Sequence, residues 1–100
     1  MILRERYIRQ PINGDSSWNS NSDFSGVLQQ LIVNPSAAAT TYDFSMTNDL
    51  GDVVYDKKGL KGTFIDDSKL GLFGIYTMDI ANASDSTKSF SISLIWREIV

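Results

Sequence analysis

The sequence predicts an all-β protein, a single antiparallel β-sandwich of jelly-roll or immunoglobulin-like type with about seven or eight short strands. Apolar and polar residues alternate with a period of two in several short runs, and no run has a convincing helical period. Turn-forming residues recur about every 8–12 residues, a spacing typical of sandwiches. With 42% hydrophobic and 21% charged residues, the 100 residues are expected to form one domain, 1–100.

The N-terminal segment alternates without a clean apolar face. In Ile2–Gln10 both faces mix apolar and charged side chains, which suits an edge strand. An arm at residues 1–10 that becomes ordered only against a partner is the alternative. Pro11 has no main-chain donor and is expected to interrupt the ladder. Residues 13–26 are mostly Ser, Asn and Asp around Trp18, and they predict a long exposed loop.

The middle of the chain contains four expected strands. Val27–Val33 is apolar and β-prone, although its spacing also fits a helical turn. Thr40–Thr47 alternates cleanly, and Val53–Tyr55 and Leu60–Ile65 are expected to pair through a hairpin tip at Asp56–Gly59. The side chains of the second strand that are expected in the core are Tyr42, Phe44 and Met46.

The C-terminal quarter, Gly74–Ile99, has the clearest strand pattern. Two alternating runs are linked by Asn82–Lys88, which is expected to join antiparallel neighbours. The side chains of these runs that are expected to face the core are Tyr76, Met78, Ile80, Phe90, Ile92, Leu94 and Trp96. This stretch therefore predicts scaffold rather than a site.

The composition disfavours catalysis. The chain has no cysteine and no histidine, so thiolate chemistry and the commonest general base and metal ligand are missing. Asp49, Asp52 and Asp56 cluster around one turn, and Asp66 and Asp67 occupy the next, but the EF-hand pattern is absent. We therefore expect no enzyme activity, no metal and no cofactor.

The charge and hydropathy pattern also bears on partners. A net charge of −3 is unfavourable for general nucleic-acid binding, which depends on neutralising phosphates. Apolar runs are too short for a membrane span. Charges within Met1–Arg6 interrupt any signal-peptide pattern, so we expect synthesis in a cytoplasm without export by an N-terminal signal.

Basic and aromatic side chains are the candidate binding groups. Trp18 is expected either to cover one end of the core or to anchor an interface or stack on a ligand. The lysines of the predicted hairpin tip are expected to contact an acidic partner or simply to be solvated. The residues assigned to partner binding are Arg4, Arg6, Arg9, Trp18, Lys57, Lys58 and Lys61.

Several short segments, followed by a last strand rich in Ile, Trp and Arg, resemble small β-sandwich structural proteins of tailed bacteriophages. The segments that carry the resemblance are Pro11–Gly14, Tyr42–Phe44, Asn48–Gly51, Gly74–Thr77 and Asn82–Ser84. Proteins of this type decorate or cement the capsid shell. The resemblance implies a non-enzymatic virion protein whose partners are the major capsid protein or other virion proteins, with self-association left open.

Two alternative functions remain at this point. One is a ligand-recognition module such as a carbohydrate-binding domain, with Trp18 and tyrosines as stacking platforms. The other is a tail or connector component of the virion, which the sequence does not separate from a capsid role.

Overall fold

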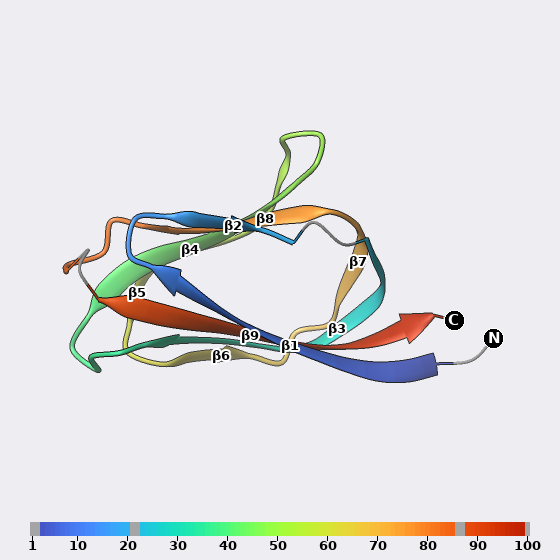
Figure 1. The fold of residues 1–100 in the computed structure, drawn as a ribbon, viewed down its shortest axis with the longest axis horizontal. Coiled ribbons are helices and arrows are strands. Elements are labelled where there is room, and N and C mark those ends of the chain that lie inside the picture. Colours follow the sequence, from blue (N-terminus) through green and yellow to red (C-terminus); the bar gives the residue numbers. More distant parts are fainter. Residues whose placement is uncertain (1–2, 21–22, 86–87, 100) are drawn as a thin grey trace.

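The computed structural model describes residues 3–20, 23–85 and 88–99, and in them the chain forms two antiparallel sheets packed face to face (Figure 1). The described strands are β1 (Leu3–Asn13), β2 (Ser17–Asn19), β3 (Phe24–Pro35), β4 (Thr41–Asn48), β5 (Val53–Lys61), β6 (Phe64–Asp66), β7 (Leu70–Gly74), β8 (Tyr76–Ala81) and β9 (Ser89–Ile99). The predicted all-β sandwich is confirmed.

The strand order is that of a jelly roll. Sheet A has the order β1-β9-β3-β6, with β7 also paired to β3, and sheet B has the order β2-β8-β4-β5. Figure 1 shows β2, β8 and β4 in the upper layer and β9, β3 and β6 in the lower one. Because β6 and β7 pair with successive parts of β3, they act as one interrupted strand, which gives the eight positions of a jelly roll.

The inward faces of the two sheets form the core. The inward-facing residues predicted from the alternating runs are all buried, and Phe44, Met46, Met78, Ile80, Ile92 and Leu94 are completely so. Further core residues come from β3 and β7, chiefly Leu28, Leu31, Val33 and Leu72. Burial of one face of each strand explains the period of two in the sequence.

The N-terminal strand lies at the edge of sheet A, as predicted, although Ile2 lies outside the described residues. Contrary to expectation, β1 continues through Pro11 to Asn13. The Gly14 N–H donates to the Lys88 carbonyl (3.1 Å), so even-numbered residues direct their main-chain groups toward β9. The main-chain groups of odd-numbered residues point to the free edge. Pro11 is odd-numbered, so its missing N–H removes no hydrogen bond from the β1–β9 ladder.

The segment 13–26, expected as an exposed loop, includes secondary structure. Within its described residues, Trp18 lies on the short strand β2 opposite Met78, and β3 begins at Phe24. The two aromatic side chains pack on or in the core, although the polar residues around them predict a loop. Apolar burial thus overrides the local turn propensity.

The predicted lysine hairpin does not exist. Strand β5 runs without interruption through Asp56–Gly59 along the edge of sheet B. Lys58 and Gly59 together lie opposite Asp43, which makes a β-bulge, and Gly59 has a φ of 68°. The Gly59 N–H donates to Asp43 Oδ1 (2.9 Å). The glycine that suggested a turn therefore forms part of the bulge, where its positive φ is tolerated.

The link Asn82–Lys88 also differs from prediction. The strands on either side of it lie in different layers, because β8 belongs to sheet B and β9 to sheet A. Each of these strands already has a hydrogen-bonded neighbour on both sides, so the two strands do not pair with each other. Their sheets instead pack with their apolar faces against one another.

A hydrogen bond joins the two sheets at the β5 side of the sandwich. The Tyr55 hydroxyl on β5 donates to Asp66 Oδ2 on β6, which belongs to the opposite sheet. The bond from Tyr55, followed by bonds from Ser68, holds the pKa of Asp66 below its ordinary value of 3.8. Burial, reinforced by Asp66, raises the pKa of Tyr55.

We expect Tyr55→Phe to lower the free energy of unfolding by about 1–2 kcal/mol at pH 7, since it removes a partly solvated hydrogen bond to a charged group. Because the pKa of Asp66 is lowered in the folded state, this contribution is present above the ordinary pKa of 3.8 and is lost as the pH falls through the folded value. Urea unfolding at pH 7 and at acidic pH measures it. Tyr7→Phe, on an exposed tyrosine, is the matched control; an equal loss in both variants contradicts the assignment.

Candidate protein-binding surface

The outward face of sheet A carries a group of apolar side chains, here called the outer patch: Tyr7, Val27, Ile32, Ile65, Phe73 and Ile95. Each lies next in sequence to residues that point into the sandwich. Phe73, Tyr7 and Ile65 are 61%, 60% and 56% exposed. Val27 is also exposed, whereas Ile32 and Ile95 are half-buried among their neighbours.

Strand register brings the outer patch together. Tyr7 lies opposite Ile95 across β1 and β9, and Ile32 lies opposite Ile65 across β3 and β6. Gly71 lies opposite Val27. The Phe73 ring covers Gly71, because a Cβ built on that glycine would meet a ring carbon at 3.3 Å. Five strands of one sheet thus contribute to the outer patch, in which Gln30, Ser93 and Arg97 lie opposite Ile95, Ile32 and Val27.

The outward face of sheet B is polar by contrast. Its central strand β4 presents Thr41, Asp43, Ser45 and Thr47, and β8 presents Thr77 and Asp79. A sheet with one face on the core normally has a polar face toward water, as sheet B has. Sheet A departs from this rule, and exposed apolar side chains gathered on one face are typical of a protein-binding site.

Charged groups lie beside the outer patch. Glu5 and Arg97 face one another across β1 and β9, one register step from the Tyr7–Ile95 pair. Arg9 lies one step to the other side, opposite Ser93. Apolar side chains flanked by exposed charges are the usual arrangement of a protein interface with a polar rim.

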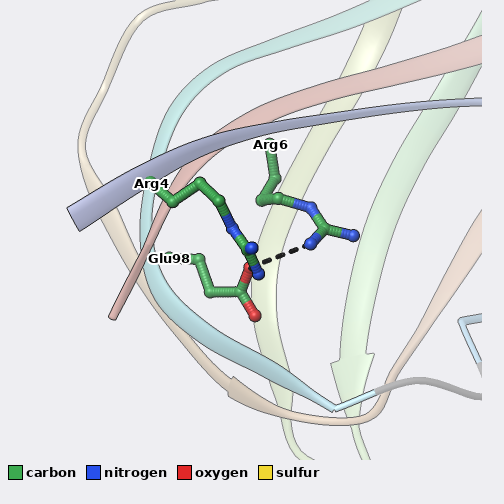
Figure 2. A network of polar contacts seen from close by, with 3 residues as sticks. All are labelled: Arg4, Arg6 and Glu98. Carbon is green, nitrogen blue, oxygen red and sulfur yellow. Dashed lines mark hydrogen bonds and ion pairs between the residues drawn. The ribbon is translucent and has the colours of Figure 1, made fainter. Parts of the chain in front are cut away.

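Two of the arginines that the sequence assigned to partner binding form an ion-pair cluster on the face of β1 opposite to the outer patch (Figure 2). Arg4 and Arg6 lie 3.2 and 3.3 Å from the same oxygen, Glu98 Oε2. Figure 2 shows both guanidinium groups converging on this carboxylate. Arg6 and Glu98 also line a small depression of about 180 Å³ with Trp96. Glu98 therefore offsets part of the positive charge that the sequence assigned to a partner.

Arg9 lies apart from this cluster. It is on the outward face of β1 and lines an open depression of about 380 Å³ together with Pro11 and Phe90. The three N-terminal arginines are thus divided between two faces of one strand, which follows from the period of two.

The other predicted binding residues lie elsewhere. Trp18 is half-buried on β2 and packs against the core, which supports its expected role as a cover for the core. Lys57, Lys58 and Lys61 lie along β5, the edge of sheet B away from β2, and Lys57 Nζ lies 5.6 Å from the Tyr55 ring centroid. The structure does not bring the seven predicted residues into one site.

Two of the acidic residues that the sequence placed in turns have structural partners: Asp66 accepts a bond from Tyr55, and Asp67 Oδ1 accepts from Gln30 Nε2 (2.9 Å). On β4, Asp43 accepts bonds from Asn82 and the Gly59 N–H, which hold its pKa below the usual value. In the described part of the chain, no group of three or more acidic side chains is placed to hold a metal ion. The same part contains no helix long and apolar enough to cross a membrane.

The outer patch escaped prediction because most of its residues lie beside core residues in short apolar runs, and the sequence does not show which of them face outward. Apolar residues of both parities occur together at Leu31–Val33, Phe64-Ile65, Leu72-Phe73 and Leu94–Trp96. A strand that is apolar on both faces was the available signal.

Neither the protein-family models nor the curated proteins with which the chain was compared give a match.

Proposed function

We propose that this chain is a non-enzymatic structural protein of a bacteriophage virion that binds the capsid shell through the outer patch and stabilises it as a decoration or cement protein. The observation that carries the proposal is the apolar outward face of sheet A beside a polar outward face of sheet B. The resemblance of its segments to phage decoration proteins points to the same role. Jelly rolls also build viral capsid domains, which is support by analogy with the fold alone.

The proposed mechanism is binding without chemistry. A protein that binds only the assembled shell stabilises it by mass action. A copy that touches two neighbouring subunits adds avidity, because the second contact forms within an already bound complex. The β4–β5 hairpin, which projects from the body in Figure 1, is a suitable second contact, with Leu50 and Val53 83% and 60% exposed.

The proposed partner is the major capsid protein or another virion protein, and the proposed location is the virion. An apolar patch with few charges suits a protein partner better than nucleic acid, whose binding requires many cationic contacts. The carbohydrate-binding alternative has less support, since Trp18, its main platform, is half-buried against the core. A tail or connector role uses the same patch and is distinguished by location.

The test uses shells of the source phage assembled without this protein. Phe73→Asp is expected to weaken binding of the purified chain by about tenfold or more, because it places a charge in an apolar contact. Thr41→Asp, on the polar outward face of sheet B, is the matched control and should bind normally. Co-sedimentation measures both, and circular dichroism confirms folding.

A second measurement separates the alternatives. Quantitative mass spectrometry of purified virions should give a copy number in proportion to the shell subunits. A few copies per particle would assign the chain to the tail or connector. Absence from the virion, or equal binding by Phe73→Asp and the parent protein, would overturn the proposal.

A further inference from the structure

The free edge of β1 has the features of a strand that pairs with another strand. In the described residues β1 is hydrogen-bonded to β9 on one side only, and it carries no bulge over eleven paired residues. Its odd-numbered residues, among them Glu5, Tyr7 and Arg9, direct their N–H and C=O groups outward, as the Gly14–Lys88 bond establishes. A long regular edge is a template for strand addition, and charged side chains along it prevent pairing with any strand whose charges do not match them.

The charges along this edge are complementary to themselves. Glu5 and Arg9 lie two residues before and after Tyr7 on the same face, and all three are exposed. An antiparallel second copy with Tyr7 opposite Tyr7 places Glu5 of each copy opposite Arg9 of the other. Opposite charges that face one another across a strand pair are stabilising. We propose that β1 pairs with β1 of a second copy in this register and forms a two-fold homodimer.

Charge selects this register over its neighbours. Registers centred on Arg6, Tyr7 or Ile8 all set odd-numbered residues, which have the outward-facing main-chain groups, opposite one another. A register centred on Arg6 would place the two Arg6 side chains directly opposite, which is destabilising. A register centred on Ile8 would set Glu5 opposite Pro11 and Arg9 opposite Tyr7, so neither charge would face an opposite charge. Only the Tyr7-centred register of these three pairs both charges.

The dimer has a consequence for the outer patch. Sheet A would continue through β1 into the second copy, so the two Tyr7 rings would join the two outer patches into one surface. This joined surface contains two equivalent copies of the outer patch, related by the two-fold axis. The inference itself does not depend on the proposed function, since self-association is measured without a shell.

A charge exchange tests the pairing by sedimentation equilibrium of the full chain. The parent protein should show a monomer–dimer equilibrium that weakens with salt. Arg9→Glu is expected to raise the dimer dissociation constant by about tenfold, since it sets two carboxylates opposite one another at two symmetric places. The double variant Glu5→Arg/Arg9→Glu should recover the parent value. Lys61→Glu makes the same change on the edge of sheet B and should have no effect.

Hydrogen exchange of the unmutated protein is an independent measurement that needs no variant to fold. The amides of Glu5, Tyr7 and Arg9 should gain protection as the protein concentration rises, while their even-numbered neighbours do not change. The inference is overturned by a parent protein that is monomeric at millimolar concentration. It is equally overturned by a double variant that stays monomeric while folded, or by an effect of Lys61→Glu as large as that of Arg9→Glu.

Discussion

Trp96→Ala is expected to lower the free energy of unfolding by about 3–5 kcal/mol, the usual cost of removing a large buried aromatic side chain. Trp96 is only 8% exposed and lies on the central strand β9 between Arg6 of β1 and Leu28 of β3. Its ring meets the Phe24 ring edge-on, with centroids 4.9 Å apart.

Urea unfolding followed by far-ultraviolet circular dichroism measures the loss, because tryptophan fluorescence itself changes in this variant. Trp96→Phe keeps part of the aromatic contact and should cost less. Trp18→Ala is the matched control, since Trp18 is half-buried and packs against the core from outside the buried cluster. A cost for Trp96→Ala no greater than that for Trp18→Ala would contradict the buried position of Trp96.

Gly26→Ala is expected to lower the free energy of unfolding by about 3 kcal/mol or more, toward the upper end for overpacking. A Cβ on Gly26 would lie 1.9 Å from the Arg97 carbonyl oxygen and 2.8 Å from its carbon. Both are main-chain atoms of β9, so no side-chain rotation relieves the clash. The β3 and β9 backbones would have to separate where Gly26 faces Glu98.

Gly71→Ala is the matched control for this prediction. Gly71 lies on β7, next to the residue that pairs with Gly26, and its added Cβ would meet only the exposed Phe73 ring at 3.3 Å. That ring can move, so we expect a change within about 0.5 kcal/mol, as for an ordinary surface substitution. Equal losses from Gly26→Ala and Gly71→Ala would contradict the close approach of the β3 and β9 main chains at Gly26.

Both predictions concern the same pair of strands. Strand β9 supplies buried residues to the core from one face and Ile95 to the outer patch from the other. We therefore expect large losses from substitutions on the inward face, whereas outward substitutions such as Phe73→Asp should change binding more than stability.

Local patterning predicted the elements that bury one face and expose the other. The inward residues of β4, β8 and β9 were all assigned correctly because a strand with one buried face repeats every two residues. The edge position of β1 followed from its charged residues on both faces. Patterns of this kind act over two to four residues, so they are visible in the sequence.

Long-range contacts account for the errors. Gly59 suggested a hairpin, but pairing with β4 along the whole of β5 makes it a bulge. The link Asn82–Lys88 suggested adjacent strands, although β2 and β4 already flank β8. The seven predicted binding residues were grouped by charge and aromatic character, whereas the fold separates them by face and by sheet.

The sequence by itself determined the all-β class, the two-sided character of several strands and the core residues of β4, β8 and β9, because these depend on short-range alternation and on composition. Only the tertiary structure decided the jelly-roll order, the sheet to which each strand belongs and the existence of the outer patch. The physical reason is that an apolar residue looks the same in the sequence whether it faces the core or a partner. The difference arises only when pairing between distant strands sets which face lies inside.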